Sequence, residues 1–221
     1  LRFKVDGVIA CTTLPDEQIR RCNDRGIPVV LYNRVVAGGN ACSVGCDQVN
    51  ANRDIADRLY RSGHRQFAFI SGGEAAPVSI QRQLGFVGRL RELGVNEVAV
   101  AAGDFGYESG HAAMLTLLKG ERRPTAVVAA NDGMALGAMD AARYDCALDI
   151  PRDLSIVGFD DISSARRPPY RLTTVRQPTE ALAHRCVDLL SERIENRALP
   201  PEVLLLPGEL VIRESARIDP A

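Results

Sequence analysis

Two polar residues directly follow two apolar segments of strand length. Their side chains could therefore contact a ligand bound at the ends of these strands. Asn131 follows segment 125–130, and Asp160 follows segment 154–159. In open parallel sheets, ligands bind in the crevice beyond the carboxyl ends of the strands. An amide that donates and accepts hydrogen bonds, together with an acceptor-only carboxylate, suits a molecule that carries several hydroxyl groups. Asn131 and Asp160 are therefore the first candidates for binding a small polar ligand.

The aspartates that follow these two residues are expected to serve the backbone instead. Asp132 is interpreted as the N-cap of a helix that begins at Gly133, because a carboxylate there accepts hydrogen bonds from the first free amides of the helix. Asp161 is interpreted as the cap of the turn that follows it.

Signatures of catalysis and of metal binding are absent from the sequence. The patterns GxGxxG, GxxxxGK[ST], GxSxG and HExxH do not occur, and His64, His111 and His184 are far apart. Cys42 and Cys46 lack the CxxC spacing and the nearby histidines of a zinc site. We therefore predict no enzyme activity, no metal site and no cofactor.

The amino-acid composition limits which binding partners and which cellular compartment are expected. The net charge of −1 excludes a broad basic field that would bind nucleic acid through its phosphates. A packed core of this size does not need disulfides, so the six cysteines are expected as free thiols, which is typical of the cytoplasm. No apolar run approaches the ~18 residues of a membrane span, and residues 1–10 lack the features of a signal peptide. A cytoplasmic protein without membrane association is predicted.

Apolar segments alternate with amphipathic stretches along the chain, a pattern that predicts βαβ units with parallel sheets. Strands are expected at 5–10, 28–32, 66–71, 97–101, 125–130, 154–159, 173–176 and 203–206. Helices are expected at 16–25, 50–62, 79–93, 107–119, 132–144 and 179–196. Glycines follow four of these helices, and left-handed C-caps are expected there: Gly26, Gly63, Gly94 and Gly120.

Three sequence blocks in segment 124–178 point to a protein family. They read PTAVVAANDGMALGA, PRDLSIVGFDD and LTTVRQP, in that order. Shorter matches are GHR at 63–65, RQLGF at 82–86, GDF at 103–105 and VIRES at 211–215. Together they resemble the effector-binding core of the LacI/GalR family of transcriptional regulators, from Val5 to Ser215.

This resemblance implies an α/β fold of the type I periplasmic binding protein kind. Two lobes, each a parallel sheet flanked by helices, would enclose a ligand cleft between them. The chain would cross near His64, Gln177 and Leu206, which gives an N-terminal lobe of 1–64 and 178–205 and a C-terminal lobe of 65–177 and 206–216. The family's helix-turn-helix headpiece, hinge helix and first core strand and helix have no counterpart in this sequence, so the N-terminal lobe is expected to be incomplete.

The resemblance also implies roles for individual residues in the cleft. Arg82 stands at the position of an arginine that reaches into the cleft, where a guanidinium could bind two hydroxyls or a carboxylate. The counterpart of Asp160 accepts hydrogen bonds from the effector. Phe105 matches an aromatic residue that lies against the flat face of a ligand, and a core aromatic is the equal alternative.

Three further candidates complete the expected site. Asn131 would add hydrogen bonds to ligand hydroxyls. Gln177, at the second crossing, could report ligand binding to the hinge. Asp47 is a candidate in the first lobe, and its alternative role is to cap the helix that begins near Asn50.

The implied function is the effector-binding and dimerisation domain of a LacI-type regulator. The effector would be a sugar, sugar acid, polyol or purine, and a homodimer would contact operator DNA only through a headpiece absent from this chain. The alternative is a periplasmic sugar-binding protein of a transport system, which has the same fold. Segment 172–175 and the Arg213-Glu214-Ser215 ending favour the regulator.

Overall fold

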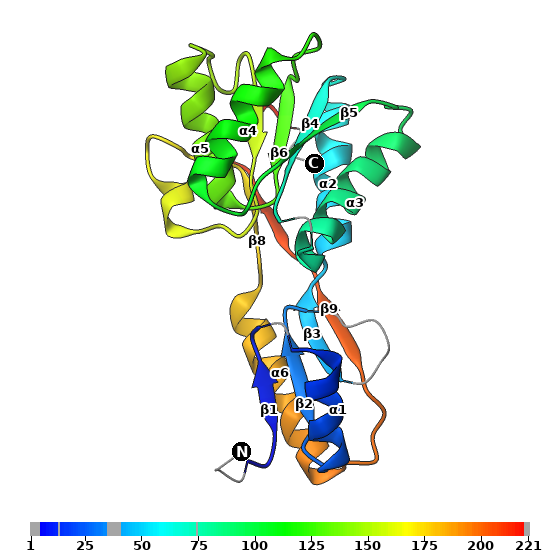
Figure 1. Ribbon diagram of the computed structural model, residues 1–221. Helices are drawn as coiled ribbons and strands as arrows, with labels where there is room; N and C mark the ends of the chain where they lie inside the picture. Colours follow the sequence, from blue (N-terminus) through cyan, green and yellow to red (C-terminus); the bar gives the residue numbers. More distant parts are fainter. Residues whose placement is uncertain (1–4, 13, 35–40, 74, 219–221) are drawn as a thin grey trace. The chain divides into compact units, whose positions relative to one another are not determined.

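The computed structural model describes residues 5–12, 14–34, 41–73 and 75–218, which form two compact units (Figure 1). Unit 1 comprises Leu1–Asp47 and Pro178–Pro207, and unit 2 comprises Gln48–Gln177 and Gly208–Ala221. The chain therefore passes between the units after residues 47, 177 and 207, and each unit is described by itself.

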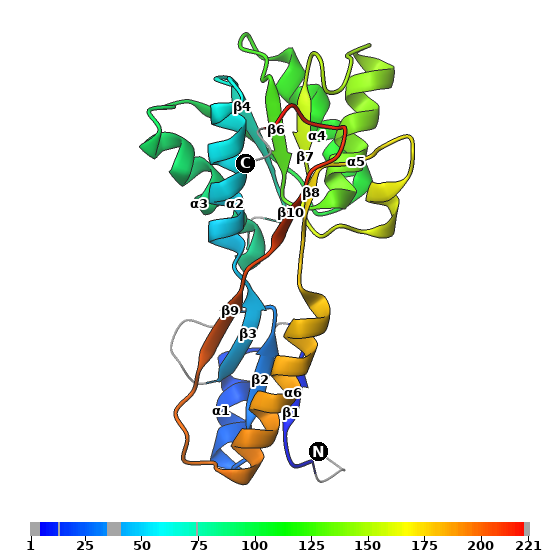
Figure 2. The ribbon, with the colours of Figure 1, turned by 180° about the vertical axis from the view of Figure 1, so that it is seen from behind.

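Unit 1 is a parallel sheet of four strands in the order β1-β2-β3-β9 with a helix on each face (Figures 1 and 2). Its strands are β1 (Val8–Ala10), β2 (Val29–Tyr32), β3 (Cys42–Cys46) and β9 (Val203–Leu206). Its helices are α1 (Asp16–Asp24) and α6 (Thr179–Glu195). Helix α6 directs Leu182, Cys186 and Leu189 into the unit.

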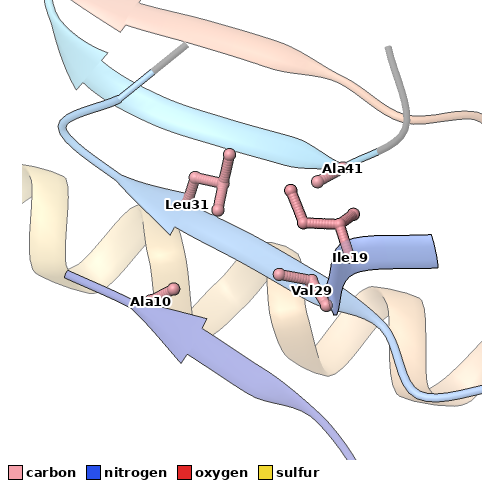
Figure 3. Packing of buried hydrophobic residues seen from close by; sticks show 5 residues of the cluster. All are labelled: Ala10, Ile19, Val29, Leu31 and Ala41. Carbon is pink, nitrogen blue, oxygen red and sulfur yellow. The ribbon is translucent and has the colours of Figure 1, made fainter. Parts of the chain in front are cut away.

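The core between α1 and the sheet is small. Ile19 of α1 is completely buried against Val29 and Leu31 of β2, with Ala10 and Ala41 beside them (Figure 3). Burying an aliphatic side chain of this size contributes roughly 1.5–3 kcal/mol. Helix α1 is therefore attached to the sheet by the buried Ile19 and by the partly buried Cys22 beside it.

Unit 2 contains the larger sheet, in the order β5-β4-β6-β7 with every pair parallel. Its strands are β4 (Phe67–Ser71), β5 (Val98–Ala102), β6 (Ala126–Ala129) and β7 (Ser155–Val157). A separate antiparallel pair joins β8 (Thr174–Arg176) to β10 (Glu209–Val211). The inner strand β6 and the last strand of this order, β7, are buried along their whole length, as expected for a parallel sheet covered on both faces.

Two helix pairs cover this sheet, one pair on each face (Figures 1 and 2). The helices are α2 (Gln48–Arg61), α3 (Pro77–Glu92), α4 (Tyr107–Lys119) and α5 (Asp132–Asp140), with a π-helical turn, Ala141–Asp145, continuing α5 and a 3-10 turn at Ser163–Arg166. Helix α4 packs closely on α5 because both present glycine at the contact. A Cβ on Gly137 would overlap the Tyr107 carbonyl oxygen, and one on Gly110 would overlap the backbone of Met134.

The first helix of unit 2 explains where the units divide. The resemblance implies a first crossing near His64, but α2 belongs with α3, to which Arg53–Glu92 and Asp57–Arg89 ion pairs join it. Gly85 of α3 lies so close to Val49 of α2 that a Cβ would overlap the carbonyl oxygen. The first passage therefore lies after Asp47, before α2.

The expected α/β class with parallel sheets flanked by helices is confirmed, and each expected strand and helix has a counterpart. Two strands were not expected. β3 is built from small residues, Cys-Ser-Val-Gly-Cys, and β10 has three residues, so neither shows a long apolar run. Gly26, Gly63 and Gly94 have the expected positive φ, but Gly120 has φ −64° and ψ 156°, so the helix before it ends in extended backbone.

Candidate functional site

A buried arginine and an aspartate meet at the carboxyl ends of β6 and β7. Arg82 extends from α3, and its side chain is 4% exposed. Its Nη2 donates to Asp160 Oδ1 over 3.1 Å, and its Nη1 donates to the carbonyl oxygen of Ala130, directly after β6. Its guanidinium carbon lies 3.8 Å from the centre of the Phe159 ring. A guanidinium this deep needs such partners, because an unpaired buried charge is costly.

Asp160 is held in a backbone conformation that aspartate rarely adopts. Its φ is +118°, a region that glycine favours and that costs other residues on the order of 1–3 kcal/mol. Its amide donates to the Val175 carbonyl oxygen (2.8 Å), and its Oδ1 accepts from Gln177 Nε2 (2.6 Å). Such strain is found at sites where the surrounding structure dictates the direction of a side chain. The Asp160 carboxylate is thus positioned by contacts on both sides.

The charge of Asp160 reflects two opposing effects. Burial raises the pKa of this carboxyl above its usual value, and the Arg82 charge and the hydrogen bonds from Gln177 and Arg82 act in the opposite direction. Its side chain remains 29% exposed. The carboxylate is therefore accessible to a ligand while it is paired on one oxygen.

Asn131, and not Asp132, caps the helix α5. Asn131 Oδ1 accepts from the Met134 amide and its Nδ2 donates to the Phe105 carbonyl oxygen, both over 3.0 Å. Asp132 is instead the first residue of α5 and is completely buried, where it accepts hydrogen bonds from Thr174 Oγ1 (2.5 Å) and the Ile162 amide (2.8 Å). Burial raises the pKa of Asp132 to about 6.

Phe105 lies in the loop after β5 and is half-buried. Its φ is +71°, and its ring lies against Gly72, where a Cβ would overlap the ring atoms. The hydrogen bond from Asn131 to its carbonyl oxygen connects this loop to the end of β6. Because Ala130, the neighbour of Asn131, accepts from Arg82, the five candidates of unit 2 belong to one connected group.

Asp47 lies apart from that group, in unit 1. It precedes the first residue of α2, and its amide donates to the Leu206 carbonyl oxygen over 2.8 Å. Its part in ligand binding stays a prediction.

Gln48 was not a candidate from the sequence, and Asp161 was expected to cap a turn. Gln48 is 3% exposed and accepts from Arg82 Nε over 2.8 Å, but a glutamine at the start of a helix carries no sequence signal. Asp161 is not the cap of a turn, since its completely buried carboxylate accepts from Arg213, Arg176 and Arg166. Burial would raise the pKa of Asp161, but these hydrogen bonds together hold it below the usual value. Because Arg176 and Arg213 lie 15 and 52 residues away from Asp161 in the sequence, this cluster cannot be recognised before the fold is known.

The residues that the structure describes were also compared with the requirements of a metal site and of a membrane-spanning helix. Among them, no group of three or more His, Cys, Asp or Glu side chains is arranged to hold a metal ion. Within the same ranges, no helix is long and apolar enough to cross a bilayer. The six cysteines are free thiols. What remains is a polar site with a forked cation, a carboxylate and two amides, which suits the hydroxyl groups of a small molecule.

Comparison with known proteins shows the family of the chain. Residues 56–216 match the family described as periplasmic binding protein-like domain. The HTH-type transcriptional repressor PurR of Yersinia pestis is 34% identical over 222 residues, which is 98% of this chain and 65% of the relative. The chain thus spans 65% of the length of the curated relatives that it matches first. These relatives are transcriptional regulators, which agrees with the prediction that the chain is not an enzyme.

Solved structures give the same picture. A LacI transcriptional regulator from a Rhodococcus species is 30% identical with a TM-score of 0.89, over 97% of this chain and 79% of that one. The complex of the regulator CelR with cellobiose is 32% identical with a TM-score of 0.83, over 96% and 66%. A LacI-family regulator from Enterococcus faecalis with bound ribose is 26% identical with a TM-score of 0.85, over 97% and 79%.

Proposed function

Because this chain belongs to the LacI family of transcriptional regulators and has the type I periplasmic binding protein fold, we propose that it binds a small polar effector through Arg82 and Asp160. The observation that carries the proposal is the strained, partly exposed Asp160 carboxylate paired with a buried guanidinium at the carboxyl ends of β6 and β7. Ligands of parallel α/β sheets bind at such ends.

The chemistry of the site favours a sugar or a sugar derivative. Among the residues that the structure describes, both hydrogen bonds to the Asp160 carboxylate end on Oδ1. Oδ2 is therefore the oxygen that we assign to a ligand hydroxyl, and Phe105 would offer a flat apolar surface to a ring. Two related regulators hold cellobiose and ribose, which supports this class. Sugar acids, polyols and purines are the other classes that the donors and acceptors would fit.

The regulatory role concerns the whole protein. We propose that the effector changes the affinity of a homodimer for operator DNA, which a separate headpiece would contact, in the cytoplasm. Such coupling requires the effector to bind two conformations with different affinity. The net charge of −1 gives residues 1–221 no electrostatic attraction to DNA, so no operator-specific binding is expected from them alone.

Dimerisation can be tested separately. A headpiece that contacts a two-fold symmetric operator requires a symmetric partner. Sedimentation at micromolar concentration should therefore give about twice the mass of the chain, since obligate interfaces bury roughly 2,000 Å² or more. A stable monomer would instead favour a transport receptor.

Effector binding can be tested with a panel of compounds in a thermal-shift assay. The panel contains D-ribose, cellobiose, D-glucose, D-glucuronate, ribitol, hypoxanthine and guanine, each at millimolar concentration. Ligand at 100 times its Kd stabilises a folded protein by about 2.7 kcal/mol. A shift of several degrees for one class and none for the others would identify the effector class. No shift with any compound would contradict the proposal.

A further inference from the structure

Four polar side chains of unit 2 form one continuous chain of hydrogen bonds. Gln48 Oε1 accepts from Arg82 Nε (2.8 Å), Arg82 Nη2 donates to Asp160 Oδ1 (3.1 Å), and Gln177 Nε2 donates to the same oxygen (2.6 Å). We call this the Gln48–Gln177 chain. Its two inner members are the proposed effector ligands, and its two outer members are amides.

The outer members occupy special positions in the sequence. Gln48 is the first residue of unit 2, and Gln177 is the last residue before the chain enters unit 1. The Gln48–Gln177 chain therefore starts and ends at two of the three places where the polypeptide passes between units. Arg82 and Asp160, at its centre, are bonded directly to the residues at these two passages.

Gln48 is fixed in place by its helix. Its carbonyl oxygen accepts from Asn52 Nδ2 (2.9 Å), and the close approach of Val49 to Gly85 holds the start of α2 against α3. Gln48 Oε1, together with the Ala130 carbonyl oxygen and Asp160 Oδ1, holds the rotation of the Arg82 guanidinium about its last bonds. That rotation determines the direction of Nη2, the atom that meets Asp160.

We propose that Gln48 is a positioning residue for the effector site and that it links effector binding to the conformation of the segment entering α2. The inference rests on the proposed function and goes beyond it, because Gln48 need not touch the effector. A ligand that pulls the Asp160 carboxylate or the Arg82 guanidinium changes the hydrogen bond at Arg82 Nε. By reciprocity, the conformation of segment 46–48 changes the affinity for the ligand.

The first test needs no ligand. Solvent exchange of the Arg82 Nε–H is measured by NMR in the wild-type chain and in Gln48→Leu, Gln48→Glu and Gln66→Leu. Leucine removes the oxygen that accepts from Arg82 Nε and keeps a side chain of similar size, whereas glutamate again provides an oxygen that can accept this hydrogen bond. Gln66, exposed at the amino end of β4, is the matched control. We expect exchange to become about 10-fold faster in Gln48→Leu, as for one lost hydrogen bond to a charged group, and to return towards wild type in Gln48→Glu.

The second test adds D-ribose and cellobiose, followed by calorimetry and by amide exchange of residues 44–50. We expect Gln48→Leu to lower the affinity about 10-fold, Gln48→Glu to recover it, and Gln66→Leu to leave it unchanged. Sugar should slow the exchange of segment 44–50 in the wild type and not in Gln48→Leu. Equal slowing in both, or unchanged Arg82 Nε–H exchange in Gln48→Leu, would overturn the role of Gln48. If neither sugar binds the wild type, the sugar assignment fails while the first test still decides about Gln48.

Discussion

Replacing Asp161 with asparagine should lower the free energy of unfolding of unit 2 by far more than the loss of an exposed ion pair would. The Asp161 side chain is completely buried, whereas the side chains of Arg213, Arg176 and Arg166 are 15%, 42% and 59% exposed. Removing one member of a buried pair costs roughly 3–5 kcal/mol, and exposed pairs contribute about 0–1 kcal/mol each. Because Arg213 has the least exposed of the three arginine side chains, its pair with Asp161 should contribute most, and we expect a loss of about 3 kcal/mol.

Asparagine isolates the effect of the charge. Asp161 has φ +54°, and asparagine tolerates this left-handed conformation as well as aspartate does, so the backbone cost is unchanged. The matched control is Glu97→Gln, which breaks an ion pair with Arg122 whose side chains are about three-quarters exposed. It should change the stability by no more than about 0.5 kcal/mol.

Thermal unfolding followed by circular dichroism measures the difference. For a unit of this size, a loss of about 3 kcal/mol lowers Tm by roughly 10 °C. Amide exchange should increase in β8 and β10, because Asp161 binds Arg176 of β8 and also Arg213, two residues beyond β10. A Tm decrease no larger than that of Glu97→Gln would refute the view that Asp161 fastens these strands.

Two further predictions concern the interior of unit 2. Burial raises the pKa of Asp132 to about 6, so the group stabilises the fold below about pH 4, and this contribution is lost as pH rises to 6. Denaturant titrations at pH 4 and pH 7 should therefore show Asp132→Asn gaining about 2.5 kcal/mol relative to wild type over that range, and a constant difference would contradict the assignment. Gly137→Ala should cost about 2 kcal/mol or more, because its Cβ overlaps the Tyr107 carbonyl oxygen, whereas Gly88→Ala, with open space around it, should gain about 0.5–1 kcal/mol. Equal stability changes for the two alanine variants, measured by the same titration, would contradict the α4–α5 packing.

The sequence predicted the elements of the fold well where apolar residues form long runs. The segments around Phe69, Val128 and Ile156 are buried strands, and their apolar character identifies them directly. β3 escaped detection because Ser43 and Gly45 interrupt its apolar residues, although all five of its residues are buried. The place of α2 could not be predicted either, because its packing against α3 depends on Gly85 and on ion pairs formed in three dimensions.

In the candidate site too, residues within sequence motifs could be predicted, whereas contacts formed only in three dimensions could not. Arg82 and Asp160 were found through the motif blocks around them, and the structure brings them together with Gln177. Asn131, and not Asp132, takes the N-cap role expected of Asp132, because Asn131 has the extended backbone that an N-cap requires. Gln48 has no motif around it, and its role becomes visible only when the direction of Arg82 Nε is known.

The central claim is that Arg82 and Asp160 bind the effector, and calorimetric titration of site variants tests it most directly. The titrant is the panel compound that stabilises the wild-type chain most. Asp160→Asn and Arg82→Met should each weaken binding by ~10 to 100-fold, the loss expected for a buried charge-assisted contact. Asp149→Asn, at a partly exposed ion pair with Arg152, should leave the affinity unchanged. Wild-type affinity in both Asp160→Asn and Arg82→Met would contradict the claim.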